Sequence, residues 1–440
     1  MADLLTTNAA ELGRQIEAGD LDPVTLTESV LDAIARHPMS GRIYARTMPE
    51  RALAEADAAR GRAKAGTRRG PLDGVPVSWK DLFDTAGCAT QAGSMLLDGR
   101  VPSADATVVA QAAARGLVSL GKTHMSELAF SGLGLNPVTA TPPNIHDPDA
   151  LPGGSSSGAA ASVAYGLAPL AIGSDTAGSV RIPAAWNDLV GLKTTHGRHP
   201  SDGIVPLCPK FDTAGPIARS VEDAAMGFTA LGGPTTDLKS CDLSGARFLV
   251  LKGTVLNDLD SAVGPAYETA LSRLSAAGAS LEHAALSCVD QALELSTLFA
   301  PEAYGTWAAT IEANPDVMFP QILERFRSGA EMSAKDYVAG WQRLNRLRTE
   351  YAAATAGYDA VILPTCPILP PKTAPLLADD AIYARANLLA LRNTRVGSLL
   401  GLCGLTVPSG TPSVGVLLQG AAGDEGRILR LGVAAERALS

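Results

Sequence analysis

Between residues 70 and 215, short apolar runs alternate with alanine-rich helical stretches and glycine-rich turns. The runs at 75–77, 117–120 and 170–172 have the length and the flanking turns of buried strands. Segments that alternate strand with helix form a sheet covered by helices, so this feature restricts the chain to few architectures. The sequence therefore predicts an α/β fold around a largely buried sheet.

Helix and strand patterns continue on both sides of this section. Residues 8–65 are predicted to be helical. Asp22-Pro23 favours a helix start, because Asp accepts hydrogen bonds from free backbone N–H groups and Pro suits the first helical turn. Beyond residue 230 the pattern predicts a strand at 248–251, a helix at about 260–277, helical sequence to about 356 and a strand at 360–363.

No low-complexity linker and no internal repeat interrupts the sequence. Apolar segments lie on both sides of the proline-rich stretch at 364–371, so we expect a rigid loop there and not a linker. We therefore predict one domain over 1–440. Its sections are a helical N-terminal part (1–65), a core (70–230), a variable helical elaboration (231–355), and closing strands and helix (356–440).

The composition is that of a globular protein and excludes some partners. Hydrophobic residues make up 46% of the chain and charged residues 18%, with a formal net charge of −9. Nucleic-acid binding requires a basic face, so an acidic chain with well-mixed charges argues against nucleic acid as a partner. The longest apolar stretch, 159–172, is too short and too interrupted by Gly and Pro to cross a membrane.

The six cysteines are scattered, without a C-x-x-C pair or a Cys/His cluster at metal-ligand spacing. Free thiols are typical of a reducing compartment. The first residues also lack the basic and apolar regions of a secretory signal. We therefore expect a cytoplasmic protein without a metal site.

Two loops rich in glycine and serine carry the strongest functional signal: PGGSSSG at 152–158 and GSDTAGSVRIP at 173–183. In the second loop, Ser179 follows a turn of small residues and precedes a predicted helix at 183–189. Backbone N–H groups and the positive helix end would then lie near the Ser179 hydroxyl, where an oxyanion needs them. A Gly/Ser loop alone is more often a plain turn, so both interpretations stay open at this point.

A serine nucleophile needs a base. Lys80 ends the apolar run GVPVSWK (74–80), and burial there would disfavour its ammonium form. The alternative is an exposed lysine that follows a strand. A Ser-His-Asp triad also stays open, because any of the chain's histidines could approach a serine in space: His37, His124, His146, His196, His199 and His283.

Two short patterns compete with this interpretation. GSSSG at 154–158 matches G-x-S-x-G with Ser156 at its centre, but the preceding Pro-Gly fits poorly with a strand–turn–helix elbow. Ser119 and Lys122 match S-x-x-K, but the companion motifs S-D-N and K-T-G are missing. We therefore give both patterns little weight.

Together, these segments resemble the amidase signature family. The similar stretches are GVPVSWKDLFDTAG (74–87), GKTHMSELAFSGLGLNP (121–137), PGGSSSGAAASVAYGLAPLAIGSDTAGSVRIPAAWNDLVGLKTTHGRHP (152–200), FDTAGPIARSVEDAA (211–225) and VILPTCPILPP (361–371). The resemblance is dense from about 70 to 230 and loose from 231 to 355. It implies the family fold, a large mixed β-sheet core flanked by helices on both sides.

The resemblance also implies a catalytic set. By position, Lys80 matches the family's catalytic lysine, Ser155 its cis-serine and Ser179 its nucleophile. The implied mechanism has neutral Lys80 draw a proton through Ser155 while Ser179 attacks the amide carbonyl, which gives an acyl-enzyme that water hydrolyses. The oxyanion would be held by the backbone N–H groups of Thr176, Ala177, Gly178 and Ser179.

Further positions match parts of the family's substrate site. Phe130, Ser131 and Gly132 match a loop that lines this site, although simple packing of Phe130 is an equal alternative. Arg181, with Asp175, is first expected to order the loop and second to contact a substrate carboxylate. The family commonly has Gly where Ala177 stands, and Ala would be strained there if the position needed a positive φ.

The resulting prediction is an amidase that hydrolyses a small carboxamide to carboxylate and ammonia without a cofactor or metal. One alternative is the glutamine-hydrolysing subunit of a tRNA-dependent amidotransferase, and another is a hydrolase of urea-like C–N bonds, of the biuret or allophanate type. The expected partner is a small-molecule amide, with no nucleic acid and no membrane. Family members often form homodimers, so a homodimer is also compatible with the resemblance.

Overall fold

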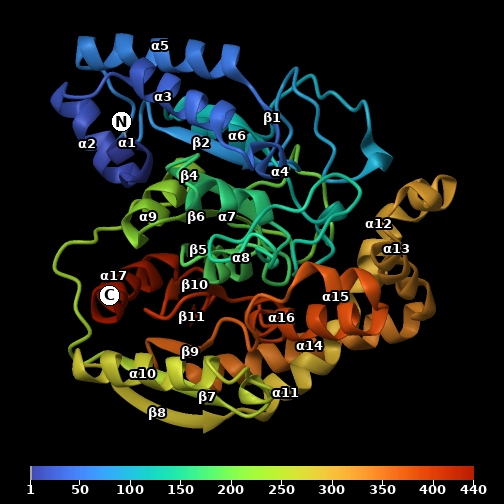
Figure 1. The fold of residues 1–440 in the computed structure, drawn as a ribbon. Coiled ribbons are helices and arrows are strands. Elements are labelled where there is room, and N and C mark those ends of the chain that lie inside the picture. Colours follow the sequence, from blue (N-terminus) through green and yellow to red (C-terminus); the bar gives the residue numbers. More distant parts are fainter. Residues whose placement is uncertain (1) are drawn as a thin grey trace.

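The computed structural model describes residues 2–440, and its centre is one mixed sheet of eleven strands (Figure 1). The strand order is β1-β3-β2-β4-β6-β5-β10-β11-β9-β7-β8. Helices surround this sheet, as predicted. The strands are β1 (Tyr44–Thr47), β2 (Pro76–Lys80), β3 (Val118–Thr123), β4 (Leu170–Ser174), β5 (Val190–Lys193), β6 (Ala214–Ala218), β7 (Arg247–Lys252), β8 (Ser280–Ala285), β9 (Ala360–Pro364), β10 (Cys403–Pro408) and β11 (Gly415–Gly420).

In Figure 1, α2, α3 and α5 cover the β1 end of the sheet, whereas α10 lies beside β7 at the other end. Helices α12 and α13 project at one side of the molecule. The helices are α1 (Ala2–Thr6), α2 (Ala9–Ala18), α3 (Pro23–Arg36), α4 (Ser40–Ile43), α5 (Pro49–Ala65), α6 (Thr107–Ala114), α7 (Ser157–Ala164), α8 (Arg181–Trp186), α9 (Val221–Ala230), α10 (Val263–Ala276), α11 (Ser287–Glu294), α12 (Phe299–Ala313), α13 (Pro320–Arg327), α14 (Ala334–Thr355), α15 (Thr373–Ala378), α16 (Asp380–Leu399) and α17 (Glu425–Leu439).

Most predicted elements are present in the structure. The strands predicted at 75–77, 117–120, 170–172, 248–251 and 360–363 correspond to β2, β3, β4, β7 and β9. Asp22 caps α3 as predicted, because its carboxylate accepts from the N–H groups of Val24 at 2.8 Å and Thr25 at 3.2 Å. The helix predicted at 183–189 begins earlier, at Arg181.

Two edge strands were not predicted. Strand β1 lies in the section predicted to be helical, and β8 lies in the variable section. Both occupy an end of the sheet and have one partner each, β3 and β7 respectively. Strand β1 has only four residues and β8 is largely exposed, so neither has the continuous apolar run that marks a buried strand.

The parallel strands β2, β3 and β4 place their carboxyl ends at one edge of the sheet. Lys80 pairs with Thr123 across β2 and β3, and Trp79 pairs with Ile172 across β2 and β4. Strand β6 is antiparallel to β4, so its first residue, Ala214, lies opposite Ser174. In open sheets, crevices at the carboxyl ends of parallel strands are common ligand sites, and this edge is the first place to look for one.

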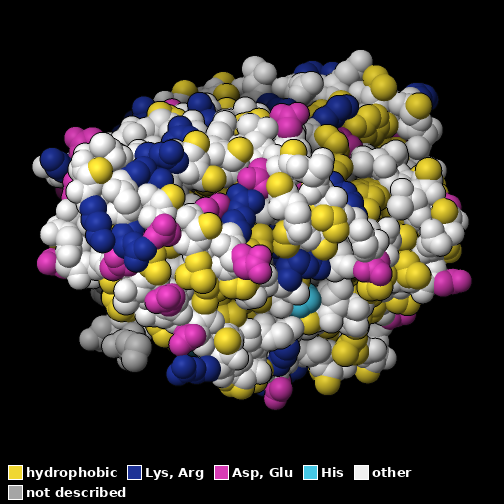
Figure 2. Space-filling model, turned by 90° about the horizontal axis from the view of Figure 1, so that it is seen from above, with side chains coloured by type: hydrophobic (Ala, Val, Ile, Leu, Met, Phe, Trp, Pro, Cys, Tyr) yellow, Lys and Arg dark blue, Asp and Glu magenta, His cyan; other side chains and the backbone are white. Residues whose placement is uncertain are grey.

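The surface is mixed in charge. On the face shown in Figure 2, Lys and Arg side chains are interspersed with Asp and Glu. Within residues 2–440, no helix is both long enough and apolar enough to cross a membrane.

Candidate active site

Lys80 is the last residue of β2, and its side chain is fully buried. The Nζ atom donates to Ser155 Oγ at 2.7 Å and to Ser174 Oγ at 2.8 Å. Burial lowers the pKa of Lys80 to about 7, although Asp175 and Asp212 oppose this shift. The side chain is therefore not an exposed lysine that follows a strand, and a large share of it is neutral near pH 7.

The loop before α7 holds Ser155 rigidly. The Ser155 carbonyl accepts from the Ser126 N–H at 3.1 Å, and the Gly154 N–H donates to the Gly132 carbonyl at 2.8 Å. A Cβ at Gly154 would lie 2.5 Å from the backbone nitrogen of Gly134, so only glycine allows this close approach. The glycines of the loop thus let Ser155 reach Lys80.

Ser156 has a different environment from Ser155. Its hydroxyl donates to the Ser174 carbonyl at 3.2 Å and accepts from the Ser174 N–H at 3.3 Å. Because both bonds tie its side chain to buried backbone, Ser156 links α7 to β4. The G-x-S-x-G interpretation is therefore not supported.

The S-x-x-K pair lies inside β3. Ser119 accepts a hydrogen bond from Trp79 Nε1 at 3.2 Å, and Lys122 Nζ lies 3.4 Å from Asp81 Oδ1. Lys122 Nζ also donates to Thr90 Oγ1 at 2.8 Å. These side chains are bound to partners in the core and hold the strand in place.

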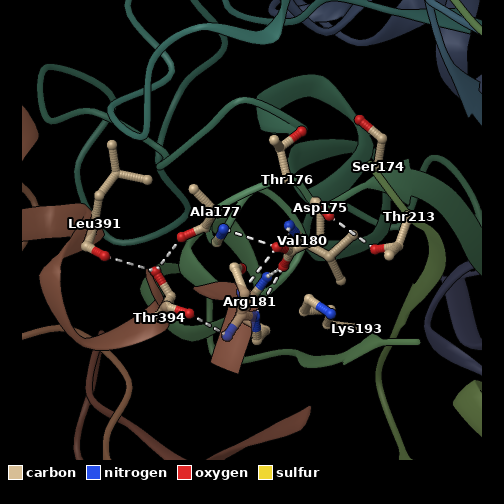
Figure 3. Close-up of polar contacts among 12 residues, drawn as sticks. Ser174, Asp175, Thr176, Ala177, Val180, Arg181, Lys193, Thr213, Leu391 and Thr394 are labelled. Atoms are coloured by element: carbon tan, nitrogen blue, oxygen red, sulfur yellow. Dashed lines mark hydrogen bonds and ion pairs between the residues drawn. The ribbon is translucent and has the colours of Figure 1, made fainter. Parts of the chain in front are cut away.

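The segment that we call the 174–181 loop connects β4 to α8 and is organised by Asp175 (Figure 3). The Asp175 carboxylate accepts from the N–H groups of Gly178 at 2.7 Å and Val180 at 3.2 Å. It also accepts from Arg181 Nε and Nη2, both at 2.8 Å. Burial is the largest single influence on Asp175 and raises the pKa of its carboxyl, but the charge and hydrogen bonds of Arg181, with smaller contributions from Lys193 and the Val180 N–H, together outweigh it and hold this pKa below its usual value.

Arg181 is entirely committed to this loop and to α16. Its Nη1 donates to the Thr394 carbonyl at 2.7 Å, its Nη2 also donates to Ser398 Oγ at 3.0 Å, and the residue is fully buried. The loop-ordering role expected for Arg181 agrees with this geometry. Contrary to the second expectation, Arg181 has no nitrogen free for a substrate carboxylate.

Of the four backbone N–H groups predicted to form the oxyanion hole, three are free to bind an oxyanion. The Gly178 N–H already donates to Asp175, whereas those of Thr176, Ala177 and Ser179 have no hydrogen-bond partner within residues 2–440. Gly178 has φ +146°, and a Cβ there would lie 2.2 Å from Thr394 Oγ1. Ala177 is not among the described non-glycine residues with positive φ, so the strain considered for it does not arise.

Ser179 lies on a cavity and is 3% exposed. Thr176 and Ala177 line the same cavity, so all three residues with free N–H donors belong to its wall. Within residues 2–440, no hydrogen bond joins the hydroxyls of Ser179 and Ser155. The structure therefore holds the lysine–serine pair together and leaves the Ser179 hydroxyl unpaired.

Two of the four predicted substrate contacts, Phe130 and Ser131, line this cavity, whereas Gly132 and Arg181 do not. The Gly132 N–H donates to Asn387 Oδ1 at 2.9 Å. Ser131 Oγ accepts from the Tyr383 hydroxyl at 3.1 Å. Gly132 therefore lies behind the wall, where it fastens the loop to α16.

Sequence reasoning missed several residues of the site. Ser174 accepts a hydrogen bond from Lys80 Nζ and is the last residue of β4. Because this strand was predicted, the position of Ser174 at its end could have marked it as a site residue. Asp212 accepts from Thr176 Oγ1 at 2.5 Å, and Thr394 Oγ1 donates to the Ala177 carbonyl at 2.6 Å. No motif marks Phe299, Arg325 and Leu391, which we call the second wall of the cavity.

The cavity around Ser179 has no histidine among its lining residues. His199 lines a neighbouring cavity, with Ser174, Thr176 and Asp212. Burial lowers the pKa of His199 to about 4, and neither of its ring nitrogens has a hydrogen-bond partner in the described part of the chain, residues 2–440. The geometry thus favours the lysine over a histidine as the base. Within residues 2–440, no group of three or more His, Cys, Asp or Glu side chains is arranged to hold a metal ion.

Comparisons with known proteins agree with this geometry. The amidase family profile matches residues 25–429. The 2-amino-5-chloromuconic acid deaminase of Comamonas testosteroni is 35% identical, over 98% of this chain and 96% of that protein. A glutamyl-tRNA(Gln) amidotransferase subunit of Symbiobacterium thermophilum is 32% identical, over 92% of this chain and 90% of that protein.

A crystal structure of an amidase superposes on this fold with a TM-score of 0.89 and 31% identity, and the match covers 99% of this chain and 100% of the other. The match extends well beyond the glycine- and serine-rich loops to the whole sheet and its helices. The chain therefore belongs to the amidase family and is an enzyme that hydrolyses amide C–N bonds.

Proposed function

We propose that this chain hydrolyses small carboxamides to a carboxylate and ammonia through an acyl-enzyme on Ser179. The observation that carries the proposal is the buried contact of 2.7 Å between Lys80 Nζ and Ser155 Oγ, at the strand edge that also bears the 174–181 loop. A neutral amine in hydrogen-bond contact with a hydroxyl can accept its proton, whereas an ammonium cannot.

The proposed first step is attack of Ser179 Oγ on the amide carbon. The Ser179 proton passes to Ser155 Oγ while the Ser155 proton passes to Lys80 Nζ, so that no oxygen of the relay carries a free charge. The carbonyl oxygen becomes an oxyanion, for which the N–H groups of Thr176, Ala177 and Ser179 are the available donors. Within residues 2–440 these N–H groups have no hydrogen-bond partner, so none of them has to break a protein hydrogen bond to bind the oxyanion.

In the second half of the reaction, the proton returns along the same path. Lys80 returns a proton through Ser155 to the departing nitrogen, the C–N bond breaks and ammonia leaves. Water then attacks the acyl ester of Ser179, with the same relay as base, and the carboxylate departs. The relay uses only side chains of this chain, so we also propose that activity is independent of added metal.

We further propose that the chain acts as one domain in the cytoplasm and without a partner subunit. Its strands, from β1 near residue 44 to β11 near residue 420, belong to one sheet, which supports a single unit. The similarity to an amidotransferase subunit favours a second candidate, a subunit that depends on a partner. The net charge of −9 argues against a role in tRNA binding for this chain itself.

The test is ammonia release by the purified chain from a panel of small amides, with Ser179→Ala and Lys80→Ala measured in parallel. We expect turnover of at least one amide, lost in both variants and unaffected by a chelator. Glutamine turnover that appears only after a partner is added would favour the amidotransferase subunit. Turnover that survives Ser179→Ala would contradict the assignment of the nucleophile.

A further inference from the structure

The second wall of the Ser179 cavity carries a cation without a counter-charge. Arg325, near the end of α13, lines the cavity, and its guanidinium carbon lies 4.4 Å from the ring centre of Phe130. Its Nη1 atom is buried and has no hydrogen-bond partner among residues 2–440. One face of the guanidinium therefore stacks on an aromatic ring, while at least one N–H-bearing nitrogen is unused.

A second arginine of the same kind lies behind this wall. Arg395, on α16, is 7% exposed, and its Nε atom has no hydrogen-bond partner. Its guanidinium carbon lies 6.0 Å from the ring centre of Phe299, which lines the cavity. Burial, and then the charge of Arg325, lower the pKa of Arg395 to about 9, so the two cations repel one another across this region.

Arg181 shows how this fold satisfies a buried guanidinium elsewhere. It is fully buried, and Asp175 accepts from two of its nitrogens. Within residues 2–440, neither Arg325 nor Arg395 forms an ion pair. Arg395 is buried and Arg325 is partly buried. An unpaired charge that is largely removed from water is costly, and stacking on an aromatic ring returns only part of that cost. The missing counter-charge is therefore expected to come from a ligand.

We propose that the substrate is an amide that also carries a carboxylate, and that Arg325 binds this carboxylate while Ser179 attacks the amide carbon. Arg395 acts from behind Phe299 as a positioning residue, whose charge makes the wall more positive. The inference rests on the proposed function, since it takes Ser179 to be the nucleophile. A planar guanidinium with free N–H groups matches the planar, two-oxygen geometry of a carboxylate.

This arrangement also predicts that the enzyme discriminates between amides by their charge. An amide of the same shape with no charge would leave Arg325 unpaired, so it would bind less well than the acid. An amide with a positive charge at that end would meet two cations and be rejected. The second wall would therefore select amides by the charge at the end remote from the reacting bond.

The first experiment compares kcat/KM for the monoamides of malonic, succinic, glutaric and adipic acids, each against its own diamide. We expect the monoamide of at least one pair to be preferred by about 100-fold. In Arg325→Met that ratio should fall to within a few-fold of unity, chiefly through KM of the monoamide, and Arg325→Lys should restore part of it. Arg327→Met is the matched control, because Arg327 lies on the same helix but pairs with Glu312 at the exposed surface.

The second experiment measures binding of the same monoamides to Ser179→Ala by calorimetry, which requires no turnover. We expect binding that is lost in Ser179→Ala/Arg325→Met and weakened in Ser179→Ala/Arg395→Met, with circular dichroism to verify folding. If the diamides are preferred, or the ratio is the same in Arg325→Met and Arg327→Met, the carboxylate inference is wrong and the amidase proposal stands. If monoamides bind through Arg325 but no amide is hydrolysed, the amidase proposal is wrong and the inference that Arg325 binds a carboxylate stands.

Discussion

The 174–181 loop and the second wall face the same cavity but are built in opposite ways. In the loop, the Asp175 carboxylate accepts five hydrogen bonds from groups within six residues of it, and Arg181 is matched by that carboxylate. In the second wall, Arg325 has an aromatic contact and no ion pair. The charged groups of the loop pair with one another, whereas the Arg325 guanidinium in the wall can still bind a partner. This difference suggests that the loop determines the reaction and the wall determines the substrate.

The largest expected effect separates the two regions by activity. Ser179→Ala should lower kcat by about 10⁴-fold or more for every amide that the chain hydrolyses, because the acyl-enzyme cannot form. Substitutions in the second wall should instead change the ranking of amides. Ammonia release over the panel measures both. A variant of Phe299 or Leu391 that abolished turnover of all amides equally would contradict the division of roles between the loop and the second wall.

A stability measurement tests whether the ion pair between Asp175 and Arg181 holds the loop together. Asp175→Asn leaves the buried Arg181 guanidinium without its counter-charge, and it should lower the free energy of unfolding by about 3–5 kcal/mol. The control is Glu312→Gln, which removes the exposed partner of Arg327 and should have little effect on the Tm. Denaturant unfolding of the three proteins gives the comparison, and equal stabilities would show that the ion pair does not hold the loop.

The pH dependence of kcat/KM reports on Lys80. The folded protein lowers the pKa of Lys80 to about 7, so the neutral base is present above that pH and is lost as the pH falls below it. Activity should therefore rise with pH through about 7 and decrease about tenfold per unit below it. A profile that is flat from pH 8 down to pH 5 would exclude Lys80 as the base.

Ser174→Ala should sharpen this result. The Ser174 hydroxyl accepts from Lys80 Nζ at 2.8 Å, a bond that favours the ammonium more than the amine. Its loss should move the pH profile to lower pH and reduce kcat about tenfold, since Lys80 is held less firmly. A reduced kcat without any shift in the profile would mean that Ser174 serves only packing.

The smallest effect is expected at Ala177. Because Ala177 does not require positive φ, replacement by Gly relieves no strain. The greater freedom of the unfolded chain should make Ala177→Gly less stable by about 0.5–1 kcal/mol, with kcat nearly unchanged. A gain in stability on thermal unfolding would show that the loop is strained at this position.

The same two regions explain what the sequence could predict. Local patterns of glycine, serine and a strand-end lysine pointed to Ser179 and Lys80 but left alternatives open, and the resemblance to the amidase signature family then implied the set Lys80, Ser155 and Ser179. The buried strands β2, β4 and β9 were predictable because each overlaps a short apolar run, at 75–77, 170–172 and 360–363.

The second wall could not be predicted, because its residues come from distant helices. Phe299, Arg325 and Leu391 lie on α12, α13 and α16, and only the tertiary fold brings them to Ser179. In the sequence, Arg325 and Arg327 are both arginines near the end of a helix, and nothing local separates the partly buried residue from the exposed one. For Arg181, the sequence could not reveal that Thr394 and Ser398 take its remaining nitrogens.

The most direct test of the central claim is covalent labelling with a fluorophosphonate, a reagent that phosphonylates activated serine hydroxyls with loss of fluoride. Intact mass and peptide mapping would locate the adduct, and the rate would be followed from pH 5 to pH 9. The account predicts one adduct on Ser179, formed faster as the pH rises through about 7 and strongly slowed in Lys80→Ala. An adduct on Ser156 or Ser155, or labelling of Ser179 at an unchanged rate in Lys80→Ala, would contradict it.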